Sequence, residues 1–137
     1  MLLLPPLVLV AILSTSGPPA ELVAAEQKQL AGVWLVVGGS WPADVQKRTR
    51  ITIADGVLTI VQGEERSQLV VDLDPTTSPR HINLTKNQRV ARGIYELKDD
   101  TLKLCYEVQG DAARPAAFAV TAGSEILLIL RRDRTPD

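Results

Sequence analysis

The stretch TRITIADGVLTIV, residues 49–61, carries the strongest local signal for a fold in this chain. On its first arm the residues alternate, so that Ile51 and Ile53 share one face of an extended strand. Asp55-Gly56 follows, and this pair favours a two-residue hairpin turn because both residues tolerate a positive φ. Residues 57–61 are rich in β-branched side chains and suit the returning strand. The stretch therefore predicts a β-hairpin with one apolar face.

The same rhythm continues on both sides of this hairpin, as short apolar runs separated by turn residues. The expected strands are residues 33–37, 49–53, 57–61, 68–72, 81–84, 91–97, 101–108, 116–120 and 124–132. Residues 26–30 are expected to form a single helical turn, and residues 41–47 a loop broken by Pro42. Closing such a sheet removes its exposed edges. The predicted fold is all-β, a small antiparallel up-and-down barrel of about eight strands, whose interior side chains fill or which holds one small ligand.

Composition excludes several classes of function. The chain has 137 residues, which fits one domain, and 45% of them are hydrophobic, which excludes a disordered chain. Its net charge of -1 and its aromatic content of 4% argue against a nucleic-acid partner. The chain contains one cysteine and one histidine, so an intramolecular disulfide and a zinc site made of four thiolates are both excluded. We therefore expect no cofactor and no enzyme activity.

The amino terminus departs from this globular composition. Residues 2–13 form an apolar run that is too short to span a bilayer and is followed by small residues up to Ala25. This arrangement predicts a signal peptide over residues 1–25, cleaved after Ala25, and a barrel domain over residues 26–137. The absence of Lys or Arg before the run and the Pro5-Pro6 pair are atypical, so an uncleaved anchor or a start codon placed too far downstream stays open. The predicted location is periplasmic or extracellular, with no stable membrane span after cleavage.

Gly32-Val33-Trp34 opens the first expected strand and is similar to the Gly-x-Trp signature of lipocalins. In that superfamily the Trp closes one end of the barrel, and an Arg near the end of the last strand packs across it. The resemblance implies that Trp34 meets Arg131 or Arg132, because a guanidinium over an indole gains cation–π attraction.

A second resemblance covers residues 30–132, nearly the whole mature chain. The segments GIYEL (93–97) and DTLKLCY (100–106) are followed by Arg114-Pro115 and Phe118, and preceded by LDP (73–75), Pro79 and Ile82. This pattern resembles a lipocalin-like domain family that is abundant in planctomycete bacteria. The chain has Asn83 where the family usually has Asp, and Asp99 where it usually has Gly. The resemblance implies the barrel fold and a bacterial origin, and it brings no assigned reaction.

Three groups of residues could carry chemistry, and each has a plainer interpretation. Cys105 could be a reactive thiol, but a free Cys in a central strand is usually an inert packing residue. His81 could act as a base or metal ligand, yet it stands alone beside Arg80. Asp72 and Asp74 could hold calcium, although Pro75 fits an ordinary turn better.

The basic residues form two further groups. Lys86, Arg89 and Arg92 have no aromatic neighbours suited to stacking bases, and we interpret them as a solvated strand edge. Arg114 could hold an anionic head group at the barrel mouth, although a loop anchor is the favoured interpretation.

The leading hypothesis is an exported binding or interaction module that holds a small hydrophobic or amphipathic molecule. The candidate ligand or mouth residues are Tyr95, Cys105, Tyr106, Arg114 and Phe118. The first alternative is a structural protein of the cell envelope with a filled barrel. The second is a thiol-dependent or hydrolytic enzyme, for which no catalytic constellation is visible.

Overall fold

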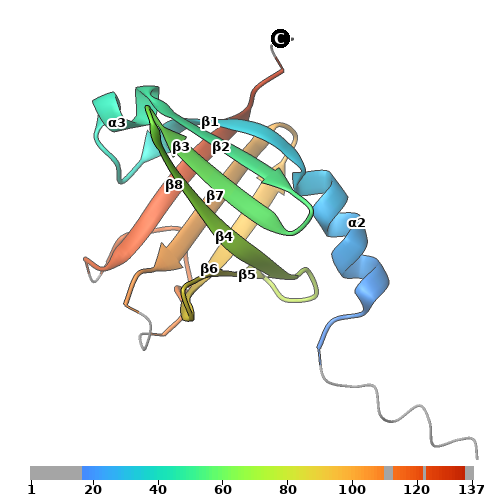
Figure 1. Ribbon diagram of the computed structural model, residues 1–137. Coiled ribbons are helices and arrows are strands. Elements are labelled where there is room, and N and C mark those ends of the chain that lie inside the picture. Colours follow the sequence, from blue (N-terminus) through green and yellow to red (C-terminus); the bar gives the residue numbers. More distant parts are fainter. Residues whose placement is uncertain (1–16, 110–112, 122, 135–137) are drawn as a thin grey trace, which may run out of the picture.

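Eight antiparallel strands close into a barrel in the order of the sequence, β1 to β8, in a computed structural model that describes residues 17–109, 113–121 and 123–134. The strands are β1 (Gly32–Gly39), β2 (Thr49–Ala54), β3 (Val57–Gln62), β4 (Glu65–Asp74), β5 (Arg80–Lys86), β6 (Arg89–Lys98), β7 (Thr101–Glu107) and β8 (Glu125–Arg132). The barrel closes where β8 pairs with β1 (Figure 1). The expected all-β, up-and-down barrel is confirmed.

The hairpin turns explain the regular topology. Asp55 and Gly56 have φ values of 50° and 76°, so this turn has the positive-φ conformation expected of its sequence. Two-residue connections also join β3 to β4, β5 to β6 and β6 to β7, as the registers Gln62↔Glu65, Lys86↔Arg89 and Lys98↔Thr101 show. Such short connections force neighbouring strands to pair, which produces the sequential order of the barrel.

Two helices correct the expectation that the chain has at most one helical turn. Helix α2 (Ala20–Leu30) begins after Pro19, and α3 (Ala43–Lys47) begins after Pro42 inside the segment expected to be a loop. Alanine, Glu, Gln, Lys and Leu make up most of α2, and these residues have high helix propensity. Proline is compatible with a helix start because the first N–H groups have no intrahelical partner. No described helix has the length and apolar character needed to cross a membrane.

The connection between β7 and β8 also differs from expectation, because residues 116–120 form no strand. This connection lies against the outer side of the barrel. Cys105 donates its S–H to the carbonyl of Ala119 at 3.7 Å, and Ile94 and Cys105 are buried although both occupy outward-facing positions. The barrel therefore has a small outer layer beside β6 and β7.

The main core lies inside the barrel, where inward-facing residues of all eight strands meet Leu30 from α2. Its fully buried members include Trp34, Tyr95 and a set of aliphatic residues: Leu30, Ile51, Leu58, Ile82, Leu102, Leu104, Leu128 and Leu130. Figure 1 shows α2 at one end of the barrel, beside the β2–β3 turn and the β4–β5 loop. We call this the helix end. The opposite end, with the β3–β4 and β5–β6 turns, is the open end.

Candidate ligand-binding site at the open end of the barrel

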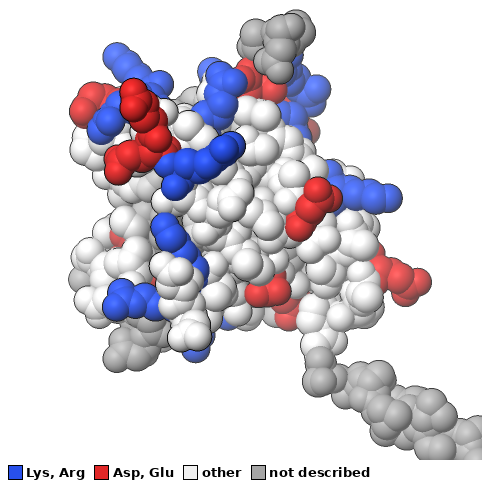
Figure 2. Space-filling model, viewed as in Figure 1, with Lys and Arg blue, Asp and Glu red and all other residues white. Residues whose placement is uncertain are grey.

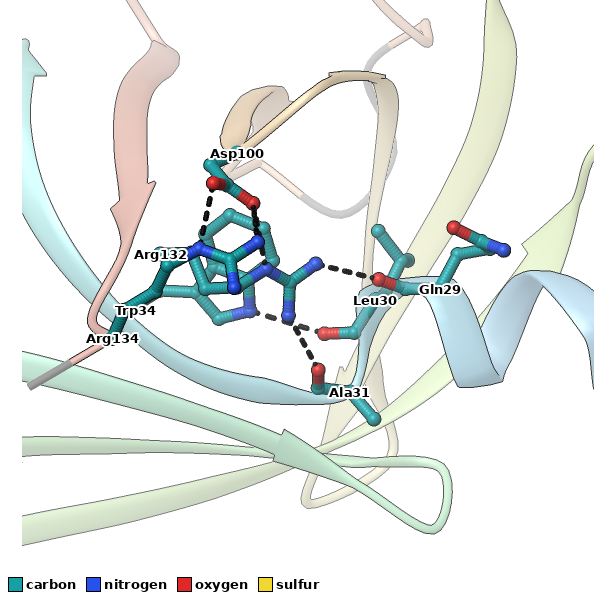
Figure 3. Close-up of polar contacts among 7 residues, drawn as sticks. All are labelled: Gln29, Leu30, Ala31, Trp34, Asp100, Arg132 and Arg134. Carbon is teal, nitrogen blue, oxygen red and sulfur yellow. Dashed lines mark hydrogen bonds and ion pairs between the residues drawn. The ribbon is translucent and has the colours of Figure 1, made fainter. Parts of the chain in front are cut away.

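The helix end is sealed by Trp34 and Arg132. The Arg132 guanidinium lies 4.3 Å from the centroid of the Trp34 ring, and Trp34 is completely buried. The indole N–H donates to the Leu30 carbonyl at 3.0 Å, which ties the end of α2 to the ring (Figure 3). The second candidate partner, Arg131, is exposed and pairs with Leu35 of β1. The residue over the indole is therefore Arg132.

The Arg132 guanidinium also forms hydrogen bonds with several polar groups at this end. Arg132 donates to the carbonyls of Ala31 at 2.8 Å and Gln29 at 2.9 Å, and to Asp100 at 3.2 Å. Arg134 also donates to both carboxylate oxygens of Asp100. The hydrogen bond from Arg134, with a smaller one from Arg132, lowers the pKa of Asp100 below its usual value. All these donors are engaged within the fold, so this cluster is a structural clamp.

Tyr95, a candidate ligand or mouth residue, lies at the helix end, where it and Phe118 line a second depression beside the β4–β5 loop. It is 1% exposed and pairs with Arg80 across β5 and β6. Arg80 forms an ion pair with the largely buried Glu26 of α2 at 3.3 Å. Burial first, and then the negative charge of Glu26, raise the pKa of Tyr95. Tyr95 is therefore part of the contact between α2 and the barrel.

Cys105, Arg114 and Phe118 lie in the outer layer and not at the mouth. Cys105 faces away from the barrel interior and is 0% exposed, and burial raises the pKa of its thiol. Arg114 donates to the carbonyls of Gly93 at 2.8 Å and Ile82 at 3.2 Å, which makes it the loop anchor that the sequence favoured. Phe118 is half-buried beside the β4–β5 loop.

The remaining sequence candidates serve ordinary structural roles. The Asp74 carboxylate accepts hydrogen bonds from the N–H and the hydroxyl of Thr76, as in a plain turn. His81 pairs with Asp74 across β4 and β5, and burial, followed by the positive charge of Arg114, lowers its pKa. The described residues contain no group of three or more His, Cys, Asp or Glu side chains arranged to hold a metal ion.

Only Tyr106 among the candidate mouth residues faces the open end. There it helps to line a depression of about 940 Å³, which we call the open-end bowl. The apolar residues of its lining are Leu69, Leu84, Val90, Ala91, Tyr106 and Val108, and the polar ones are Lys86, Asn87, Gln88, Arg89 and Arg92. The bowl has the size of a small-molecule site, an apolar floor and a few convergent polar groups.

Strand alternation explains why cations surround this bowl. On β5 the inward positions run through Ile82 and Leu84 to Lys86, and on β6 Arg89 pairs with Lys86 and precedes the inward Ala91 by two residues. Both cations therefore project from the inward-facing side, just beyond the apolar core. Lys86 donates to Ser67 of β4 at 3.2 Å, across the rim.

The charge of the bowl is uniformly positive, since its described lining contains Lys86, Arg89 and Arg92 and no acidic residue. Neither Lys86 nor Arg89 forms an ion pair with another described residue. On the side where Figure 1 shows the β3–β4 and β5–β6 turns, Figure 2 shows lysine and arginine side chains along the edge, with Asp and Glu side chains among them near the β3–β4 turn. In a chain of net charge -1, this concentration favours an anionic partner.

The β5–β6 turn at the rim is conformationally strained. Asn87 and Gln88 have φ values of 51° and 68°, in the left-handed region. Asn tolerates this conformation, whereas a long side chain such as Gln adopts it at a cost of about 1 kcal/mol. Positive φ values also occur at Asp55 and Asp99 in other two-residue turns, so this conformation is the ordinary geometry of such a hairpin and does not by itself mark the bowl as a site.

The barrel interior below the bowl is almost filled. An enclosed cavity of about 40 Å³ remains, lined by apolar residues and Tyr106. A ligand pocket usually needs about 300 Å³ or more, so this cavity cannot hold an organic ligand. The hypothesis of a ligand enclosed within the barrel is therefore not favoured by this conformation, and binding has to begin in the bowl.

Sequence analysis missed one buried pair, Glu107 and Glu125. They lie directly opposite each other on β7 and β8 and are 4% and 9% exposed. Glu107 accepts a hydrogen bond from the Gln109 N–H, and Glu125 accepts from the N–H and hydroxyl of Thr121. The pair thus fixes both ends of the outer layer. Only the strand register places these carboxylates together, and no local motif marks them.

No family model matched the chain, and the comparisons with curated proteins and with solved structures found no similar protein either.

Proposed function

We propose that the protein is an exported lipocalin-like binding module, and that its ligand is a small anionic amphiphile held in the open-end bowl. The observation that carries this proposal is that the bowl combines an apolar floor with a rim of three basic residues, and that its described lining contains no acidic residue. The apolar part of the ligand would contact Leu84, Ala91 and Tyr106. Its carboxylate or phosphate would lie between Lys86 and Arg89, whose donors suit both groups.

Export and family membership are parts of the same proposal. Export is supported by the apolar run and the small residues that end at Ala25. The buried residues of α2 are Glu26 and Leu30, and both follow the expected cleavage site. Cleavage after Ala25 would thus keep the contacts that seal the helix end. Sequencing the amino terminus of the protein recovered from the periplasm of a bacterial host tests this, with Glu26 expected as the first residue.

The binding proposal is tested by isothermal titration calorimetry with three probes that share an eight-carbon chain: octanoate, octyl phosphate and octyl glucoside. We expect the two anions to bind more tightly than the neutral glucoside and to bind more weakly at high salt. Exchanging Lys86→Gln together with Arg89→Gln removes two cations and should weaken octanoate binding about tenfold, because each exposed charge contributes up to about 1 kcal/mol.

The matched control exchanges Lys98→Gln and Arg131→Gln, two exposed cations that lie outside the described lining of the bowl. This variant has the same net charge as the first one and should bind octanoate like the unaltered protein. Equal loss in both variants would mean that only net charge matters, and it would remove the bowl as the site.

A second candidate function is a structural role in the cell envelope. The small size of the interior cavity, about 40 Å³, favours it. Absence of binding for all three probes, at both low and high salt, would support this candidate. A thiol-dependent enzyme is not proposed, since Cys105 is 0% exposed and burial raises its pKa.

A further inference from the structure

Tyr106 stands between the two spaces at the open end. It lines both the bowl of about 940 Å³ and the enclosed cavity of about 40 Å³. Leu69, Leu84 and Ala91 are the other residues that line both spaces. The two spaces are thus neighbours, and the Tyr106 ring is the largest side chain of the group that borders both.

The neighbouring strand carries small residues beside this ring. The partner of Tyr106 on β6 is Gly93, which faces inward like Ile82 and carries no side chain. A Cβ built at Gly93 would lie 2.7 Å from the Tyr106 Cβ and 2.6 Å from the Cys105 carbonyl oxygen, so no other residue fits there. The next inward residue of β6 toward the open end is the small Ala91. Tyr106 and the Cys105 carbonyl therefore fill the space over Gly93, and Ala91 is the small inner-wall residue beside the ring toward the open end.

The hydroxyl group of Tyr106 also does not hold the ring in place. Tyr106 is partly exposed, and no group among the described residues hydrogen-bonds its hydroxyl. Trp34, by contrast, is held through its indole N–H by the Leu30 carbonyl at 3.0 Å. Rotation of the Tyr106 side chain therefore breaks no hydrogen bond within the described fold, and side-chain rotations are fast compared with ligand exchange.

We propose that Tyr106 determines the length of the apolar chain that the bowl accepts, by acting as a movable partition between bowl and cavity. With the ring in place, the chain of a bound amphiphile ends on the ring face. With the ring rotated away, the bowl and the cavity join beside Ala91, and a longer chain can extend toward Leu104 and Leu128. This inference rests on the proposed function, because Lys86 and Arg89 anchor the head group.

The test measures dissociation constants for straight-chain carboxylates of increasing length, from butanoate to dodecanoate. In the unaltered protein, affinity should rise roughly fourfold for each methylene until the chain reaches the ring, and then level off. Tyr106→Ala should move this plateau to longer chains and raise the ratio of dodecanoate affinity to butanoate affinity at least about tenfold. Tyr106→Phe keeps the ring and should retain the original plateau.

Ala91→Val provides a second variant that keeps Tyr106. It adds two methyl groups beside the ring and should shorten the accepted chain, so that the plateau begins at a shorter carboxylate. This variant keeps the inference testable if Tyr106→Ala does not fold. In addition, Tyr106 becomes the sole tyrosine in a Tyr95→Phe background, so its near-ultraviolet circular dichroism should change when dodecanoate binds and not when butanoate binds.

The possible failures are distinguishable. If carboxylates bind but the plateau is the same in the unaltered protein, Tyr106→Ala and Ala91→Val, the partition is wrong while the binding function stands. If no carboxylate binds to the unaltered protein or to any variant, the proposed function is wrong, and the partition fails with it.

Discussion

Arg132 and Trp34 are cross-strand partners on the last and first strands, and the guanidinium of one lies 4.3 Å from the ring centroid of the other. This single contact joins the two ends of the barrel sequence. The same guanidinium holds the carbonyls of Gln29 and Ala31 at the end of α2. Arg132 therefore contributes both to closure of the barrel and to docking of the helix.

Arg132→Ala is the first prediction. It should lower the free energy of unfolding by about 2–4 kcal/mol. A cation–π contact contributes up to about 2 kcal/mol and a hydrogen bond to a charged group about 1.5–3 kcal/mol, and these contributions are not additive because one guanidinium makes all of them. Urea unfolding followed by tryptophan fluorescence measures this. Arg131→Ala removes an exposed arginine from the neighbouring position and should change the stability by less than about 0.5 kcal/mol. A similar loss in both variants would contradict the assignment.

The second prediction concerns alkaline pH. Burial, together with Glu26, raises the pKa of Tyr95, and burial raises the pKa of Tyr106 to about 12. Both hydroxyls keep their protons more firmly in the folded chain than in the unfolded chain, where the pKa is about 10. Their contribution to stability is therefore complete below pH 10 and is lost as the pH rises from about 10 to 12.

The measurement is simple because Tyr95 and Tyr106 are the chain's two tyrosines. Tyrosinate absorbance should appear together with unfolding, and not before it. Tyr95→Phe should flatten the fall in stability above pH 10. An unaltered protein that ionises both tyrosines at pH 10 while it stays folded would exclude this linkage.

The alternation of strand residues was enough to predict the barrel, since positions such as Ile51 and Ile53 or Leu102 and Leu104 turned out to face the core together. The barrel depends on local periodicity and on the order of strands, which a sequence displays directly. The contact of Trp34 with Arg131 or Arg132 was implied only by the resemblance to lipocalins, and the phase of β8 selects Arg132.

The open-end bowl could not be predicted in the same way. Lys86 and Arg89 look like edge charges until the register shows that both continue the inward side of their strands. The mouth candidates Cys105 and Arg114 lie in the outer layer, which covers the first and uses the second as the loop anchor that the sequence favoured. Such placements depend on how a long connection docks, and no local pattern encodes this.

The third prediction is that Cys105 is chemically inert in the folded protein. It is 0% exposed beneath Ala119, and burial raises the pKa of its thiol, so little thiolate exists near neutral pH. Alkylation by iodoacetamide should be at least about a hundredfold slower in the folded chain than in urea, where the thiol has its ordinary reactivity. Mass spectrometry of the single cysteine follows the reaction. Rapid alkylation under native conditions would show that the outer layer opens readily.

The fourth prediction returns to the rim of the bowl, where Gln88 has a φ of 68°. Gln88→Gly relieves the strain of a left-handed backbone, although glycine also loses more freedom on folding. The net effect should be a stabilisation of about 0.5–1 kcal/mol, and it also creates the Asn-Gly pair that two-residue hairpin turns prefer. Gln68→Gly is the control, because Gln68 lies within β4 outside the left-handed region and should lose about 0.5–1 kcal/mol. The two variants should therefore shift the urea midpoint in opposite directions. If Gln88→Gly also weakens octanoate binding although the fold becomes more stable, the strained turn serves the bowl directly, through the side chain of Gln88 or the rigidity of the rim.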